Sequence, residues 1–122
     1  MLRVSRGFSL IEILIGLVLL AVGLLAVGTL QITSLRGTSF SQHLVQATYL
    51  AQDRLEFLKN LSFGDSRLTA NRYPDPGTTI AGVTFQREYT VTNDGVLKRI
   101  ECTVNWNDGR DHSVTFLTIR SQ

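Results

Sequence analysis

One carboxylate interrupts the apolar stretch near the N-terminus of the sequence. Glu12 lies within "RGFSLIEILIGLVLL", and the residues that follow it, 13–35, include no ionisable side chain. A carboxylate in the hydrocarbon core of a membrane costs up to about 3 kcal/mol, and residues of this kind are usually paired and functional. The chemistry that the pattern offers is therefore ion pairing, and Glu12 requires a cationic partner.

Three simpler explanations of Glu12 stand beside that one. The carboxylate could be favoured by the dipole of a helix N-terminus, by roughly 0.3–1 kcal/mol, or it could lie in the headgroup layer. The N-terminal region could also be a secretory signal peptide cut near "AVG" at residues 26–28. A glutamate is rare in the core of a signal peptide, and this disfavours the third explanation.

No other residues have the spacing of a catalytic or metal-binding site. His43, His112 and Cys102 do not form a recognised nucleophile and base pattern, and no phosphate-binding loop occurs. Asp108 and Asp111, together with His112, could bind a cation, but a polar turn between strands is the more common use of these residue types. We expect no enzymatic activity, no cofactor and no metal.

The charge of the chain is balanced except at its N-terminus. The 122 residues include 12 lysines and arginines against 10 acidic residues, and Arg3 and Arg6 account for the difference. Lys98 and Arg99 with Trp106 form the one grouping of basic and aromatic residues. Because acidic residues balance the basic ones over the rest of the chain, a nucleic-acid partner is disfavoured. Positive charge before an apolar run is retained in the cytoplasm, which places the rest of the chain on the other side of the membrane.

The lone cysteine excludes an intrachain disulfide. Cys102 is in phase with Ile100 and Val104 in "RIECTVNW", which predicts a small buried hydrophobic side chain rather than a reactive thiol.

A long helix must carry Glu12. As a helix, residues 13–35 would be roughly 35 Å long, enough to cross a bilayer core of about 30 Å. Small residues in a membrane helix usually mark the approach of another helix, which makes Gly16, Gly23 and Gly28 candidates for helix packing. A second apolar stripe with helical spacing follows, made of Phe40, Leu44, Ala47, Ala51, Leu55 and Leu58. We predict one helix from about Ser9 to about Leu61, apolar all round and then amphipathic.

The rest of the sequence predicts a small sheet. Three runs alternate between apolar and polar residues, at 82–91, 96–106 and 112–120, and Asp-Gly turns in "TNDGV" and "WNDGRD" separate them. We expect a three-stranded antiparallel meander after an irregular link, with its apolar face against the amphipathic half of the helix. The predicted fold class is therefore α+β.

The N-terminal segment resembles type IV prepilins and the pseudopilins of type II secretion. The resemblance covers a short basic leader that ends in Gly7, then Phe8, Glu12 and about twenty apolar residues. The long helix followed by a small antiparallel sheet also resembles the pilin fold. The chain then divides into a leader (1–7), an apolar transmembrane and fibre-core helix (8–35), its amphipathic continuation (36–62), and a linker and sheet (63–122).

The resemblance implies a specific processing reaction and an assembly mechanism. A prepilin peptidase would cut between Gly7 and Phe8 and methylate the new amine of Phe8, and Glu12 would pair with the N-terminal amine of a neighbouring subunit. The chain would be a single-pass inner-membrane protein, with a cytoplasmic N-terminus and a periplasmic C-terminal domain, before it enters the pilus fibre or its tip. Its partners would be the peptidase, other minor and major pilins, and the inner-membrane assembly platform.

Two departures separate the chain from the major pilins. Thr29 occupies the place where they often have a proline, and Cys102 is alone where they have a pair of cysteines. The segments "AVGLLAVGTLQITSLRGT" and "ATYLAQDRLEFLK" resemble minor pilins of the PilV type, the type IV pilus modification proteins. Minor pseudopilins of the GspI type share these features, so a type II secretion subunit is the alternative. A membrane protein without a fibre role would leave Gly7, Phe8 and Glu12 without a purpose.

Overall fold

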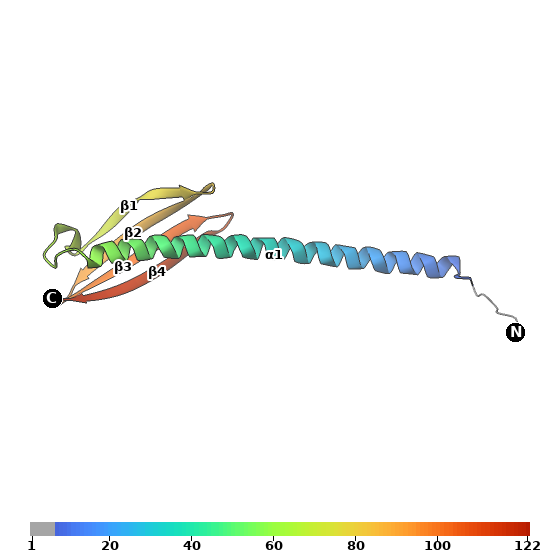
Figure 1. Cartoon of the computed structure of the whole chain (residues 1–122), viewed down its shortest axis with the longest axis horizontal. Helices are drawn as coiled ribbons and strands as arrows, with labels where there is room; N and C mark the ends of the chain where they lie inside the picture. Colours follow the sequence, from blue (N-terminus) through green and yellow to red (C-terminus); the bar gives the residue numbers. More distant parts are fainter. Residues whose placement is uncertain (1–6) are drawn as a thin grey trace. The chain divides into compact units, whose positions relative to one another are not determined.

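The computed structural model describes residues 7–122, so the predicted leader, apart from Gly7, lies outside the described residues. The chain divides into two compact units, Met1–Ser39 and Phe40–Gln122. One helix, α1 (Leu10–Lys59), contributes to both units (Figure 1). The second unit also holds a short 3-10 helix, η1 (Ser66–Leu68), and four strands, β1 (Asn71–Ile80), β2 (Val83–Asn93), β3 (Leu97–Asn107) and β4 (Asp111–Ser121). The predicted α+β fold, with one long N-terminal helix and an antiparallel sheet, is confirmed.

The number of predicted strands was wrong. The structure has four strands in the order β1-β2-β3-β4, each antiparallel to the next, and the first of them lies in the segment expected to be an irregular link. Pro74 and Pro76 argued against a strand in this segment, because proline lacks the N–H that a strand between two neighbours would donate. The edge position of β1 permits both prolines, and the pairing with β2 shifts register between Asp75 and Thr78.

Three tight turns join the strands. Ala81 and Gly82 connect β1 to β2 with φ angles of 49° and 82°, and positive values at both central residues define the type I′ turn that suits a two-residue hairpin. The two predicted Asp-Gly hairpins are confirmed, one between β2 and β3 and the other between β3 and β4.

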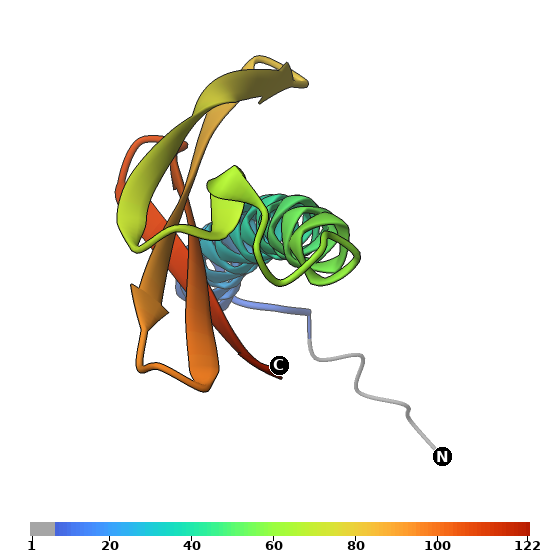
Figure 2. The ribbon, with the colours of Figure 1, turned by 90° about the vertical axis from the view of Figure 1, so that its left-hand side faces the viewer.

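The core of the second unit lies between the helix and the sheet. Figure 2 shows the strands along one side of the C-terminal part of α1. The predicted stripe on the helix is buried at Ala47, Ala51, Leu55 and Leu58, whereas Phe40 and Leu44 remain 38% and 37% exposed. Its partners are the inward side chains of the central strands and η1, which are Leu68, Phe85, Tyr89, Val91, Ile100, Cys102, Val104 and Trp106. Full burial of a leucine or phenylalanine contributes about 1.5–3 kcal/mol, so this layer holds the unit together.

Candidate processing and assembly site

The predicted cleavage point lies in an exposed segment before the helix. Gly7 and Phe8 precede α1, and the Phe8 side chain is 78% exposed. A Cβ atom added at Gly7 would meet no other atom within 4 Å, so packing within the chain does not require glycine there. The absence of a Cβ instead suits a backbone that enters a narrow groove.

Glu12 lies in the first turn of α1, and Ser9 is the cap of that turn. The Glu12 N–H is 3.0 Å from the Ser9 carbonyl oxygen and 3.3 Å from the Ser9 hydroxyl oxygen. A serine followed three residues later by a glutamate is the sequence pattern of a capping box, and it would have identified Ser9 from the sequence. The first turn is also where a helix dipole favours a carboxylate.

The three candidate packing glycines lie at open positions of the helix in the part of the chain that the structure describes. A Cβ atom at Gly16, Gly23 or Gly28 would have no neighbour within 4 Å. The large apolar side chains over residues 10–35 are 51% to 76% exposed. An apolar surface of this extent requires lipid or other helices around it.

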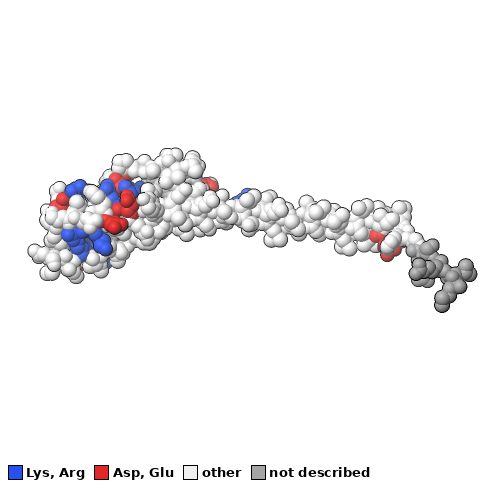
Figure 3. All heavy atoms as spheres, in the orientation of Figure 1, with Lys and Arg blue, Asp and Glu red and all other residues white. Residues whose placement is uncertain are grey.

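The N-terminal part of α1 is long and apolar enough to cross a membrane. In Figure 3 the charged atoms gather on the sheet-bearing unit, and the helix surface in view is largely free of them. Together with the apolar sequence of residues 13–35, this helix fits a membrane-anchored protein.

A cluster of two histidines and an aspartate joins the second unit's helical segment to the β3–β4 turn. Nδ1 of His43 lies 2.8 Å from Oδ2 of Asp108, and Nε2 of His112 lies 2.9 Å from Oδ1 of the same carboxylate. The hydrogen bonds from both histidines, that from His43 above all, lower the pKa of Asp108. The His112 ring also stacks on Trp106, with 5.3 Å between ring centroids. This cluster fixes the turn to the helix. The sequence suggested a grouping of Asp108 with His112, but sequence spacing gave no sign that His43 joins them.

A buried carboxylate connects the helix with the first two strands. Asp75 accepts hydrogen bonds from Arg54 over 2.6 Å and from Arg87 over 2.7 Å, and its side chain is 7% exposed. Arg87 also donates to the carbonyl oxygen of Leu50 over 2.9 Å. Arg87 is the one charged residue at an inward position of β2, and a charged side chain in such a position requires a buried partner.

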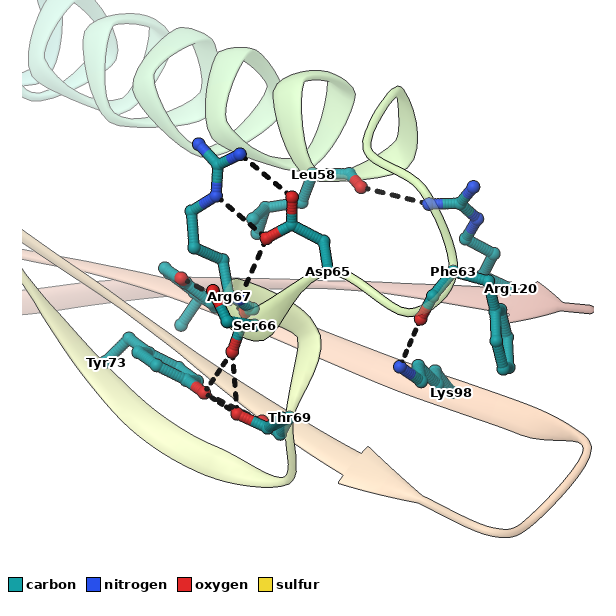
Figure 4. A network of polar contacts seen from close by, with 10 residues as sticks. Leu58, Phe63, Asp65, Ser66, Arg67, Thr69, Tyr73, Lys98 and Arg120 are labelled. Atoms are coloured by element: carbon teal, nitrogen blue, oxygen red, sulfur yellow. Dashed lines mark hydrogen bonds and ion pairs between the residues drawn. The ribbon is translucent and has the colours of Figure 1, made fainter.

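Polar contacts also order the connection from the helix to the sheet (Figure 4). The Asp65 carboxylate accepts from the backbone N–H of Arg67 over 2.9 Å and from the Arg67 guanidinium over 3.0 Å, and these hydrogen bonds lower its pKa to about 2. Tyr73 donates to the carbonyl oxygen of Thr69 over 3.0 Å, and Arg120 donates to that of Leu58 over 3.3 Å. Arg120 thereby supplies a partner for one of the last carbonyl groups of α1.

Other residues that the sequence suggested for binding or reactivity are instead mostly buried and support the fold. Lys98 is 6% exposed and donates to the carbonyl oxygen of Phe63, whereas its neighbour Arg99 is exposed on the opposite face of β3. Trp106 is 4% exposed, so the three do not form a basic and aromatic surface. Cys102 is fully buried, as predicted, and burial raises the pKa of its thiol to about 11.

The suggested cation ligands are occupied by other contacts. Asp108 lies between the two histidines, and Asp111 accepts a hydrogen bond from Asn107 over 2.6 Å. Within residues 7–122 no group of three histidine, cysteine, aspartate or glutamate side chains is arranged to hold a metal ion.

Comparison with known families agrees with the N-terminal geometry. Residues 2–28 match the model of the prokaryotic N-terminal methylation motif. No curated protein and no solved structure matches the chain.

The match and the exposed apolar helix together support a membrane-anchored protein that carries an N-terminal methylation motif. With the helix-on-sheet fold, the match supports a type IV pilin-like protein that is processed by prepilin peptidase and assembles with other pilins. The motif points to a structural subunit rather than an enzyme.

Proposed function

We propose that the chain is a minor pilin of the PilV type, incorporated in a type IV pilus or priming its assembly. The observation that carries the proposal is the coincidence of the methylation motif over residues 2–28 with a capped, exposed apolar helix that starts at Leu10, two residues after Phe8. The start of the helix and the Glu12 carboxylate therefore both lie within the matched segment, next to the residues that processing and docking would use.

Processing changes the charge at the start of the helix. Hydrolysis of the Gly7–Phe8 peptide bond by prepilin peptidase releases residues 1–7 with Arg3 and Arg6, and gives Phe8 a free amine. The same enzyme transfers a methyl group from a methyl-donor cosubstrate to that amine, and the nitrogen loses one proton as the N–C bond forms. The methylated amine still takes up a proton near neutral pH, so the mature helix begins with a positive charge.

The new amine is the partner that Glu12 requires. In the membrane, the Glu12 carboxylate of one subunit attracts the N-terminal ammonium group of a neighbour, and each ion left unpaired there costs several kcal/mol. Pairing sets the register of the incoming subunit. The exposed apolar surface of residues 10–35 then exchanges lipid contacts for contacts with other helices, and Gly16, Gly23 and Gly28 allow a close approach.

The same reasoning gives the location and the partners. Before assembly the chain crosses the inner membrane once, with residues 1–7 in the cytoplasm and the sheet-bearing unit in the periplasm. Afterwards it lies in the pilus fibre or at its tip. Its partners are prepilin peptidase, the inner-membrane assembly platform, and other minor and major pilins.

A glycine substitution tests the processing step with a matched control. Gly7→Val adds a branched Cβ at the cleavage point, and we expect the precursor to accumulate and the chain to be absent from sheared pili. Gly37→Val is the control, because Gly37 is also exposed and without neighbours within 4 Å of an added Cβ. Normal processing of the Gly7→Val variant would contradict the proposal.

The alternative is a minor pseudopilin of the GspI type in a type II secretion system. The continuous course of α1 from the apolar segment to Lys59 favours it equally. Deletion of the chain separates the two functions: loss of surface pili with normal protein secretion supports the minor pilin, and the reverse result supports the pseudopilin.

A further inference from the structure

The two edges of the sheet differ in a way that indicates a missing neighbour on one side. The β1 edge is blunted, because Pro74 and Pro76 lack N–H groups and the register shifts between Asp75 and Thr78. Natural sheets use such features to prevent edge-to-edge pairing. The β4 edge has none of them: its 11 residues contain neither proline nor glycine, and they pair with β3 in unbroken register.

Strand β4 carries large apolar side chains on both faces of the sheet, among polar ones such as Thr115 and Thr118. Val114 and Phe116 lie on the helix side, half-buried against the core. Leu117 and Ile119 lie on the opposite side, where they are 52% and 56% exposed. The outward positions of β2 are instead occupied by polar side chains, which are Thr84, Gln86, Glu88, Thr90 and Thr92. On this face the large exposed apolar side chains of β3 and β4 are Leu97, at the start of β3, and Leu117 and Ile119 at the open edge.

The chemistry of the edge specifies its occupant. Residues within β4 that face the open side present alternating N–H and C=O groups, and only an extended polypeptide offers the complementary series. Residues 113–119 carry no ionisable side chain. On the β3 side, Leu117 lies beside Glu101 and Ile119 beside Arg99. On the open side β4 offers no charged partner, so a segment that is uncharged over about seven residues fits this edge. Successive side chains of the incoming segment would lie in turn beside Phe116, on the helix side of the sheet, and beside Leu117, on the opposite side.

A second copy of the chain is a poor source of this segment. The β1 edge of a copy is blunted, which leaves only its own β4. Antiparallel pairing, the commoner arrangement, would join β4 to β4 about a two-fold axis perpendicular to the sheet. The two helical segments Phe40 to Lys59 would then run in opposite directions, unlike subunits that leave one membrane side by side.

We propose that β4 accepts an uncharged extended segment of a different subunit of the same assembly, which adds a fifth strand to the sheet. The proposal rests on the assembly function proposed above, because that function supplies different subunits in the same orientation. The added strand would cover Leu117 and Ile119 and complete the core layer at Val114 and Phe116.

Site-specific crosslinking of the full-length chain in cells tests the pairing. A photoreactive amino acid replaces Thr115, Leu117 or Ile119, one at a time, and crosslinked peptides are mapped by mass spectrometry. Strand addition predicts one partner segment, with crosslinked positions that step by about two residues from one probe to the next. A probe at Gln86, on the same face of β2, is the control and should not reach that segment. Unordered crosslinks, no crosslinks, or crosslinks only to another copy of the chain would overturn the proposal.

A charge at the edge provides a second, independent test. Leu117→Lys adds a charge at an exposed position, so the fold should persist while the probe at Ile119 loses at least tenfold of its crosslinked product. Thr90→Lys on β2 is the matched control and should leave the product unchanged. Equal loss in both variants, or no loss in either, would contradict pairing at β4. The N-terminus is sequenced in the same samples: a processed chain without ordered crosslinks overturns strand addition alone, whereas an unprocessed chain contradicts the proposed function.

Discussion

The hydroxyl oxygen of Ser9 lies 3.3 Å from the backbone nitrogen of Glu12, so these two residues form the N-terminal cap of α1. The cap uses the backbone of Glu12 and leaves its carboxylate, in the first helical turn, for another partner. Substitutions at the two positions therefore separate helix capping from ion pairing.

Glu12→Gln removes the charge and keeps the size of the side chain. We expect normal processing at Gly7 and at least a tenfold fall in the amount of chain in the sheared pilus fraction, because the neighbour's ammonium group loses its partner. Ser9→Ala is the matched control: it costs about 1 kcal/mol of helix capping but keeps the carboxylate, so most incorporation should persist. Equal incorporation of the Glu12→Gln variant and the unchanged chain would exclude the docking role.

Asp75→Ala should strongly destabilise the sheet-bearing unit. The substitution leaves Arg54 and Arg87 without their shared carboxylate, and removal of one partner from a buried ion pair typically costs about 3–5 kcal/mol. The measurement is urea unfolding of the full chain in detergent micelles, followed by the fluorescence of Trp106, the sole tryptophan.

Asp53→Ala is the control for this measurement. The Asp53 side chain is 63% exposed and lies 3.7 Å from Arg87, so its loss should change the free energy of unfolding by no more than about 0.5 kcal/mol. Similar effects of the two substitutions would show that the Asp75 contacts contribute little.

Asp65 makes the stability of the second unit depend on pH in the acid range. Its pKa falls from 3.8 to about 2 on folding, because Arg67 donates hydrogen bonds to the carboxylate. A lowered pKa means that the stabilisation is complete above the unfolded value and is lost as the pH falls from about 4 through 2. In the Asp65→Asn variant the free energy of unfolding should therefore fall less steeply as the pH is lowered over this range. Asp94→Asn, at an exposed turn position, is the control and should leave the slope unchanged. A pH profile unaffected by Asp65→Asn would contradict this assignment.

Cys102 should be unreactive in the folded protein. The side chain is fully buried, and its pKa of about 11 leaves almost no thiolate at pH 8. Iodoacetamide at pH 8 should leave the mass of the folded chain unchanged and add one carbamidomethyl group in urea. Labelling at equal rates in both conditions would mean that the sheet opens readily around β3.

Local patterns in the sequence predicted most of the fold, while long-range contacts were beyond them. The helical stripe through Ala47 to Leu58 and the Asp-Gly turns depend on neighbouring residues, and both were confirmed. The strand β1 was missed because Pro74 and Pro76 are acceptable only at a sheet edge, and an edge is a property of the whole topology.

The contacts of the second unit illustrate the same limit. His43 and Asp108 are far apart in the sequence, and only the fold brings them within 2.8 Å. The inward position of Arg87 in its strand could have indicated a buried partner, but nothing local identified Asp75 as that partner. Processing and docking at Gly7, Phe8 and Glu12 stay predictions, since they depend on an enzyme and on neighbouring subunits.

The most direct test of the central claim is the intact mass and N-terminal sequence of the chain recovered from cell envelopes. For a pilin-like subunit we expect a chain that begins at Phe8 and carries one additional methyl group. A chain that still begins at Met1, in cells with active prepilin peptidase, would contradict this expectation and leave a plain membrane anchor. A chain that begins near Thr29 would contradict it as well, because that start identifies a cleaved signal peptide.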